Sequence, residues 1–285
     1  RYGIPEYRLP KAMVDKQVET IRHLGVRIET GVVIGEDITM DQLFGMGYRA
    51  VFIGTGTGLA RKLEVPGEEL TGVMQAIYFL ETVELIHEQR LPDTHLPIRP
   101  GDRVVVVGAG NVAVDAARTA LRLGAKEVKV VDIVTEGECR ANDKELQEAL
   151  HEGVSFQFQT SVSQILGDST VNGVTLQSFS PRRIEGRESR ILPVPGTERF
   201  HPCDRVIVAI GQKPFARIVS TTTGIKTNAG GYVLTQQQPF YGMTTRAGVF
   251  AAGDVVHEPQ TVILAMREGR RVAEAIDAYL SQLED

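Results

Sequence analysis

The sequence is poor in the features that mark several classes of protein. Its only cysteines, Cys139 and Cys203, are far apart, so they form neither a CxxC redox pair nor an iron–sulfur ligand set. No apolar run approaches the roughly 18 residues that a membrane-spanning helix needs, and no signal-peptide pattern opens the chain. We therefore expect two inert cysteines, no membrane span and a cytoplasmic protein.

The charge balance excludes another class. There are 31 lysines and arginines against 36 aspartates and glutamates, a formal net charge of -5, and no basic block long enough to grip a phosphate backbone. Nucleic acid is therefore not expected as a partner. With 285 residues and 42% hydrophobic content, the chain can bury a sizeable core in one large domain or two of ordinary size.

The apolar pattern alternates between strand and helix periodicity, which predicts an α/β fold with mostly parallel sheets. A proline-bearing stretch at 90–102 is the best candidate for a domain boundary, and polar residues at 181–201 resemble a hairpin. Short strands are expected within 230–256. The predicted longer strands are 26–35, 48–58, 103–107, 127–133, 154–160, 172–179 and 204–211, and the predicted helices are 11–24, 39–47, 71–90, 111–123, 143–151 and 261–283.

A glycine-rich turn follows the run of four valines that ends at 107. Gly108 permits a tight turn, Gly110 lets the backbone approach a pyrophosphate, and Ala113 keeps the following helix close to the sheet. Free amides at the helix start favour phosphate, as does the helix dipole. A purely structural tight turn is the alternative. The residues predicted to bind a dinucleotide are Gly108, Ala109, Gly110, Asn111 and Val112.

Asp132 ends the second predicted strand of this unit. A carboxylate there can accept hydrogen bonds from the adenosine ribose hydroxyls and would repel a 2'-phosphate, and Ile133 supplies no cation to offset it. NAD(H) is therefore favoured over NADP(H). Two alternatives remain: Asp132 is simply solvated, or Arg140 and Lys144 lie close enough in sequence to accommodate a phosphate.

Two further segments share one pattern. The segment AVFIGTGTG (50–58) is a strand that runs into a turn of small residues, and GVFAAGDVV (248–256) is a strand with Asp254 at its carboxyl end. Open α/β sheets bind ligands at such strand ends. An ordinary turn at Gly253–Asp254 is the alternative.

An ordered set of motifs resembles the flavoproteins with two dinucleotide-binding domains. Within them it resembles the group of the glutamate synthase small subunit, the N-terminal half of dihydropyrimidine dehydrogenase and the ferredoxin-dependent NADH:NADP oxidoreductases. The matching segments span nearly the whole chain: YGIPEYRLPK (2–11), FIGTGTG (52–58), VPGEELTGV (65–73), VVVGAGNVAVDAARTALRLGA (105–125), VIVAIGQKP (206–214) and TRAGVFAAGDVV (245–256).

The resemblance implies two Rossmann-like domains of the glutathione-reductase type, with an incomplete FAD domain at 1–95 and 214–285 interrupted by an NAD(P)-binding domain at 96–213. It places Asp254 near the ribityl or pyrophosphate part of FAD. It also directs the amides of the last helix toward the flavin pyrimidine. The implied cofactor-binding residues of these segments are Thr55, Gly56, Ile210, Gly211, Gly253, Asp254, Gln260, Thr261 and Val262.

The same resemblance implies material upstream of Arg1. In this family the FAD glycine-rich turn lies close before the YGIPEYRLPK segment, and a cysteine-rich domain holding iron–sulfur clusters lies further upstream. We therefore expect FAD in the intact protein but not in residues 1–285 alone. The expected partners are an iron–sulfur domain or subunit and a larger catalytic subunit.

The implied activity is that of an NAD(P)H-dependent flavin oxidoreductase, with hydride transfer between NAD(P)H and FAD and electrons passed to or from iron–sulfur clusters or a partner. Many relatives carry Tyr-Arg-Arg where this chain has Asp132, Ile133 and Val134, and this departure again favours NADH. The cofactors carry the chemistry, so no catalytic residue and no metal ligand is nominated. The alternatives are a catalytically silent nucleotide-binding scaffold and a plain NAD-dependent dehydrogenase.

Overall fold

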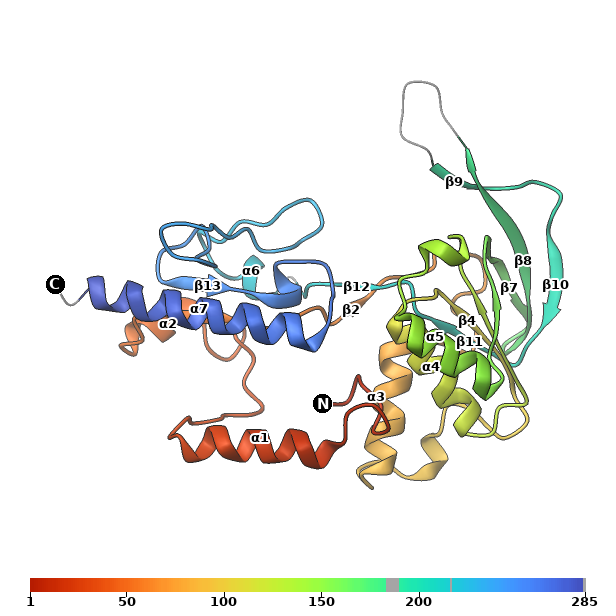
Figure 1. The fold of residues 1–285 in the computed structure, drawn as a ribbon, viewed down its shortest axis with the longest axis horizontal. Helices are drawn as coiled ribbons and strands as arrows, with labels where there is room; N and C mark the ends of the chain where they lie inside the picture. The colour runs from red at the N-terminus through yellow and green to blue at the C-terminus, as the bar shows by residue number, and fades with distance from the viewer. Residues whose placement is uncertain (183–189, 216, 284–285) are drawn as a thin grey trace. The chain divides into compact units, whose positions relative to one another are not determined.

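The computed structural model describes residues 1–182, 190–215 and 217–283 (Figure 1). The chain forms two compact units. Unit 1 contains Arg1–Val26 and Lys62–Ile210, and unit 2 contains Arg27–Arg61 and the residues from Gly211 onward.

A five-stranded parallel sheet forms the centre of unit 1. Its strand order is β3-β11-β4-β5-β6, with every neighbouring pair parallel. Parallel sheets are buried on both faces, which is why β4 consists almost entirely of valine. The strands are β3 (Val73–Gln75), β4 (Arg103–Val107), β5 (Glu127–Val131), β6 (Ser155–Gln157) and β11 (Arg205–Val208).

Three helices cover one face of this sheet, as Figure 1 shows: α3 (Ala76–His87), α4 (Asn111–Arg122) and α5 (Asp143–Glu152). Alternate strand residues such as Val104 and Val106 pack against Phe79 of α3 and against α4. The buried face of α4 is made of alanines, so its backbone lies close to the sheet.

An antiparallel sheet covers the other face. Its order is β10-β8-β7, with β9 also paired to β8. Val105 and Val107 point to this side and pack against Val162, Val174 and other apolar residues of the sheet. Unit 1 is therefore a three-layer structure. The strands are β7 (Thr160–Gly167), β8 (Val171–Arg182), β9 (Arg190–Pro193) and β10 (Arg199–Pro202).

Three short elements complete unit 1. The N-terminal segment leads into α1 (Lys11–His23), a mostly exposed helix whose Lys11 is buried. Two 3-10 turns, η1 (Asp93–His95) and η2 (Glu136–Glu138), lie in connections.

Unit 2 is built on a two-stranded parallel sheet of β1 (Val51–Ile53) and β13 (Val249–Ala251). Ile53 and Val249 belong to a core on one side, whereas Phe250 belongs to a second core with Val272 and Tyr279. A second, antiparallel pair joins β2 (Leu59–Ala60) to β12 (Gln212–Lys213). The remaining elements are α2 (Met40–Gly45), α6 (Arg217–Ser220), η3 (Gly253–Val255) and α7 (Val262–Gln282).

The predicted α/β class and the helices at 11–24, 39–47, 111–123, 143–151 and 261–283 are confirmed within a few residues. The strand predicted at 26–35 is wrong. Apart from an isolated bridge between Ile34 and Ile38, no strand among the described residues pairs with it, and apolar residues such as Val26 and Val33 are exposed. The helix predicted at 71–90 begins only at Ala76, because residues 73–75 pair with β11 as a strand.

The predicted boundary stretch at 90–102 lies inside unit 1. The Arg205 side chain donates to the Pro97 carbonyl at 3.0 Å and pairs with Asp102 at 3.1 Å. The chain thus passes from one compact unit to the other after residues 26, 61 and 210. The domain boundaries expected from the resemblance instead follow residues 95 and 213. Assigning those parts to particular nucleotides stays a prediction. Part of the expected hairpin, 183–189, lies outside the described residues, and β9 and β10 lie within the remainder.

No helix among the described residues is both long enough and apolar enough to cross a membrane.

Replacing Phe79 by alanine tests the helix layer of unit 1. Phe79 is 0% exposed at the centre of the core shared by α3 and the sheet. We expect Phe79→Ala to lower the free energy of unfolding by about 3–5 kcal/mol, because it removes buried ring surface and leaves a cavity. Urea titration measures the loss. Its neighbour Tyr78 is 60% exposed, so Tyr78→Ala should change stability by no more than about 0.5 kcal/mol. Equal losses in the two variants would contradict this packing.

Candidate dinucleotide-binding site

The turn after β4 requires glycine at its first position for a packing reason. Gly108 has φ 108°, a conformation that side chains rarely adopt. A Cβ at this position would lie 2.5 Å from the carbonyl oxygen of Ala209, which follows the neighbouring strand β11. Gly108 therefore keeps β4 and β11 in register where the chain leaves the sheet.

At position 110, unlike position 108, no steric contact with the described residues requires a glycine. Gly110 is the N-cap of α4, with φ -81° and ψ 177°, and a Cβ there would meet no heavy atom within 4 Å. Within the described part of the chain, no side chain caps the helix, so its first amides have no side-chain partner there. Open space in front of free amides at the positive end of a 12-residue helix fits a phosphate group.

Asp132 holds this turn in place. One carboxylate oxygen accepts a hydrogen bond from the amide of Ala109 at 2.6 Å, and the other accepts from the amide of Val134 at 3.2 Å. Neither of these hydrogen bonds was predicted from the sequence, which led us to expect a ribose contact or a solvated side chain. A carboxylate accepts about four hydrogen bonds, so it retains capacity for a ligand. The predicted ribose contact stays a prediction.

Cys139 and Asn142, which were not among the predicted site residues, also contact this turn and the start of α4. The thiol of Cys139 donates to the carbonyl oxygen of Ala109 at 3.1 Å. The side-chain oxygen of Asn111 accepts from the amide of Asn142, which in turn caps α5. No sequence signal marks either contact, because the pairs meet only when α4 and α5 pack side by side.

Val112, Ile133, Ile210 and Gly211 were also predicted to bind a cofactor. Val112 and Ile133 expose 40% and 37% of their surface beside the turn. Ile210 follows β11, packs partly into the core below the antiparallel sheet, and is the last residue of unit 1. Gly211 begins unit 2, where its carbonyl accepts from the amide of Arg61 at 3.0 Å.

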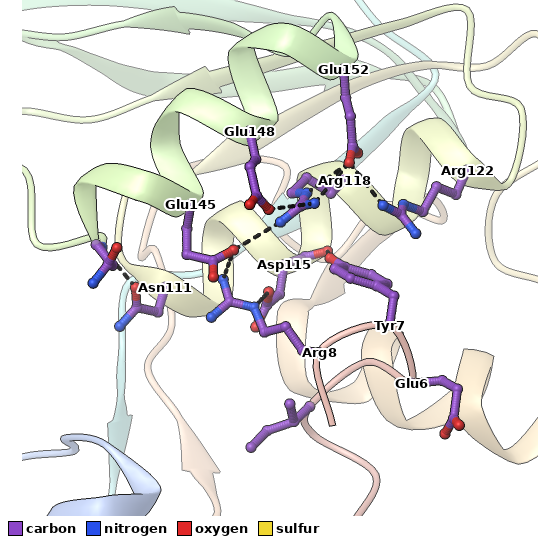
Figure 2. Close-up of polar contacts among 12 residues, drawn as sticks. Glu6, Tyr7, Arg8, Asn111, Asp115, Arg118, Arg122, Glu145, Glu148 and Glu152 are labelled. Carbon is purple, nitrogen blue, oxygen red and sulfur yellow. Dashed lines mark hydrogen bonds and ion pairs between the residues drawn. The ribbon is translucent and has the colours of Figure 1, made fainter. Parts of the chain in front are cut away.

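A buried ion network fixes α4 to α5 on the side away from the sheet (Figure 2). The guanidinium of Arg118 is 5% exposed and pairs with Glu145 at 2.8 Å, Glu148 at 3.0 Å and Glu152 at 2.8 Å. Its hydrogen bonds to Glu152 hold the pKa of that carboxyl at about 2. Three carboxylates around one buried cation leave α4 little freedom to shift.

The N-terminal segment joins the same network. Arg8 pairs with Asp115 at 2.6 Å and with Glu145 at 2.8 Å, and the ring of Tyr7 lies under the guanidinium of Arg122 at 3.9 Å (Figure 2). Burial, and to a smaller extent the nearby Glu145, raises the pKa of Asp115 to about 6 against the attraction of Arg8. These contacts give Asp115 a structural role.

In unit 2 the residues predicted for FAD gather at one edge of the small sheet. Thr55 and Gly56 follow β1, and Gly253 and Asp254 follow β13. Because β1 and β13 are parallel, their carboxyl ends share this edge. Asp254 accepts from the amide of Gln260 at 3.3 Å, which brings it to the start of α7, where Thr261 is the N-cap and Val262 the first residue.

Gly56 has φ 64° and no atom within 4 Å of a would-be Cβ, so open space also lies in front of this edge. The geometry fits a nucleotide at the carboxyl ends of the strands. The described residues contain no group of three or more His, Cys, Asp or Glu arranged to hold a metal ion.

Comparison with known proteins identifies a common family. The model of the pyridine nucleotide-disulphide oxidoreductase family matches residues 10–269. The NADP(+)-dependent formate dehydrogenase subunit beta of Moorella thermoacetica is 37% identical over 98% of this chain and 38% of its own length. The glutamate synthase small chain of Halomonas elongata, named as NADPH-dependent, is 33% identical over 98% of this chain and 60% of its own length.

A solved structure shows the same fold. Mycobacterium tuberculosis FprA in complex with NADPH superposes with a TM-score of 0.74 at 19% sequence identity, over 100% of this chain and 75% of FprA. The chain thus spans between about two fifths and three fifths of the two curated relatives named above.

An added methyl group should have different effects at the two glycines of the turn. At position 108 it should mainly lower stability, and at position 110 it should mainly weaken nucleotide binding. Gly108→Ala should cost about 2 kcal/mol or more of unfolding free energy through the strained φ and the clash with Ala209. Gly110→Ala should cost at most about 1 kcal/mol, but it should weaken binding of a nicotinamide dinucleotide by about tenfold or more, because the methyl group fills the space for the pyrophosphate. Thermal unfolding and calorimetric titration with NAD⁺ and NADP⁺ give the two quantities. Unimpaired binding by Gly110→Ala would argue against a phosphate at this position.

The raised pKa of Asp115 should make the free energy of unfolding depend on pH. This pKa rises from 3.8 to about 6 on folding, so the folded protein holds this proton more tightly than the unfolded chain. As pH rises from about 4 to about 6, wild type should lose on the order of 2–3 kcal/mol relative to Asp115→Asn. Urea titrations across this pH range measure the difference. A gap between wild type and Asp115→Asn that does not change with pH would contradict the prediction.

Proposed function

Because the chain belongs to the pyridine nucleotide-disulphide oxidoreductase family, we propose that it is the nucleotide-binding part of an NAD(P)H-dependent flavin oxidoreductase. The observation that carries the proposal is the open space before the free amides of α4. Gly110 has no protein atom to avoid, so a ligand explains a glycine there better than packing does.

In this proposal unit 1 binds the nicotinamide dinucleotide. The free amides of the first turn of α4, at Asn111 and Val112, take the pyrophosphate. Asp132 fixes the turn through Ala109 and accepts from the ribose with its remaining lone pairs. The exposed Val112 and Ile133 provide apolar surface beside the site.

Unit 2 binds FAD in the same proposal. Thr55, Gly56 and Gly253 line the strand ends, and Asp254 accepts hydrogen bonds from the flavin nucleotide. The first free amides of α7, beginning at Val262, face developing negative charge on the flavin ring and stabilise it.

Bound together, the two cofactors supply hydride transfer between nicotinamide and flavin. The protein's residues bind and orient the two nucleotides, and this chemistry needs no side-chain acid, base or nucleophile. In this proposal electrons pass to or from iron–sulfur clusters or a partner subunit, which is supported by relatives named as a small chain and as a beta subunit.

Two observations favour different pyridine nucleotides. Asp132 is a carboxylate fixed by backbone amides at the predicted ribose position, which favours NADH. The relatives with 37% and 33% identity carry NADP and NADPH in their names, which favours NADPH. We retain NADH, because charge at this position acts on the 2'-substituent directly, and NADPH is the second candidate.

Reduction of bound flavin in the intact protein tests the proposed function. Mixed anaerobically with NADH, the purified full-length protein should lose its flavin absorbance. The kcat/KM for dye reduction should be about tenfold or more higher with NADH than with NADPH, because repulsion of the 2'-phosphate by Asp132 costs about 1.4 kcal/mol or more. Gly110→Ala should impair the reaction with both nucleotides.

The other possible results would each change a different part of the proposal. A preference for NADPH would change the assigned nucleotide from NADH to NADPH, and the proposed flavin reaction would stand. Bound flavin that neither nucleotide bleaches would favour a silent nucleotide-binding scaffold. Nucleotide-dependent oxidation of a carbon substrate without flavin would favour a plain dehydrogenase.

A further inference from the structure

A second cavity of about 340 Å³ lies in unit 1, between the parallel sheet and the antiparallel sheet. It opens on the face of the parallel sheet opposite α4, so α4 and its uncapped start take no part in it. The side chains used below are Lys129, Gln157, Ser178, Arg199, Phe200 and His201.

Strand register directs two basic side chains of β10 into this space. Arg199 is paired with Leu176 of β8, and His201 is paired with Val174. Directly paired residues of an antiparallel sheet lie on the same face. Leu176 and Val174 are buried against the parallel sheet, so Arg199 and His201 face that sheet as well.

Lys129 reaches the same space from the opposite sheet. Its neighbours on β5, Val128 and Val130, are buried in the core on the helix side. Side chains alternate along a strand, so Lys129 points to the antiparallel side. Three basic residues from two sheets thus line one cavity.

The positive charge in this cavity is not neutralised by its lining. Within the part of the chain that the structure describes, neither Lys129 nor Arg199 forms an ion pair, and no carboxylate lines the cavity. Burial and the charges of Lys129 and Arg103 hold the pKa of His201 below its ordinary value, although Glu127 acts in the opposite sense.

Two carboxylates lie near the cavity without lining it. Glu198 accepts a hydrogen bond at 2.7 Å from the side-chain amide of Gln177, a lining residue, and Glu127 acts electrostatically on His201. A cationic cavity in a protein of net charge -5 is not a consequence of overall composition. Like charges that face each other repel, and a bound anion relieves that repulsion.

We propose that this cavity is a second binding site that takes a small organic anion carrying a phosphate or carboxylate group. Lys129 and Arg199 bind the anionic group, and the amide of Gln157 and the hydroxyl of Ser178 provide further polar contacts. Leu176, which faces the parallel sheet and also lines the cavity, provides an apolar wall for the organic part. The volume falls in the range of roughly 300–1,000 Å³ typical of small-molecule sites.

The sequence contains no tryptophan, so Phe200→Trp creates a single fluorescent reporter on β10, between Arg199 and His201 and beside the cavity. Four probes are titrated into the full chain: inorganic phosphate, pyrophosphate, 3-phosphoglycerate and citrate. At least one of the two organic anions should give a saturable, one-to-one change in emission and should bind more tightly than inorganic phosphate. Calorimetry with the unsubstituted chain repeats the measurement without the reporter.

The matched control is a lysine in the turn before β5. Lys126 is exposed and lies outside the cavity, so Lys126→Gln should leave the affinity unchanged, whereas Lys129→Gln should weaken it at least tenfold. Binding should persist when NAD⁺ saturates the dinucleotide site, and this result does not depend on the proposed flavin reaction. No saturable response to any probe, equal affinities of the two lysine variants, or displacement by NAD⁺ would each overturn the proposal.

Discussion

The close approach of α4 to the parallel sheet is the constraint on which unit 1 depends. Four alanines, Ala113, Ala116, Ala117 and Ala120, are all 0% exposed on the face that meets β4 and β5. A larger side chain at any of them would lift the helix from the sheet and move its N-terminus away from the turn at Gly108. The position of the free amides is therefore set by packing along the whole helix.

The opposite side of α4 is held by charge. A fully apolar contact would pack α4 and α5 together without fixing how far each slides along the other, whereas Arg118 must satisfy Glu145, Glu148 and Glu152 at once. Burying these charges costs desolvation energy, which good hydrogen-bond geometry offsets only in part. We interpret the network as a device that fixes the register of α4, with Arg8 extending it to the N-terminal segment.

The same parallel sheet serves two different surfaces. Its carboxyl edge carries the turn, Asp132 and the end of β11, where backbone amides dominate. Its face toward the antiparallel sheet carries an apolar core that gives way to Lys129, Arg199 and His201 at the cavity. Strand alternation makes this possible, because neighbouring residues of β5 serve opposite sides of one layer.

Much of this fold follows from local sequence. The run of valines in β4, the glycine turn and the alanine-rich helix are contiguous and mutually consistent, so they predict a dinucleotide-binding unit without any knowledge of distant contacts. The edge strand β3 was missed because its three residues continue into a helix-forming stretch and become a strand only by pairing with β11. The strand expected at 26–35 failed for the converse reason, since it has the residues of a strand but only one isolated bridge.

The sequence by itself determined the α/β class, which follows from the alternating periodicity along the chain. It also determined the two glycine positions of the turn and the carboxylate at the end of β5, because these are encoded within a few consecutive residues. Tertiary structure alone decided that Asp132 fixes the turn through Ala109, that Arg8 and Arg118 pin α4, and that three basic residues of two sheets share one cavity. These residues are separated by 23 to 107 positions along the chain or lie on different sheets, and sequence periodicity carries no information about which of them meet.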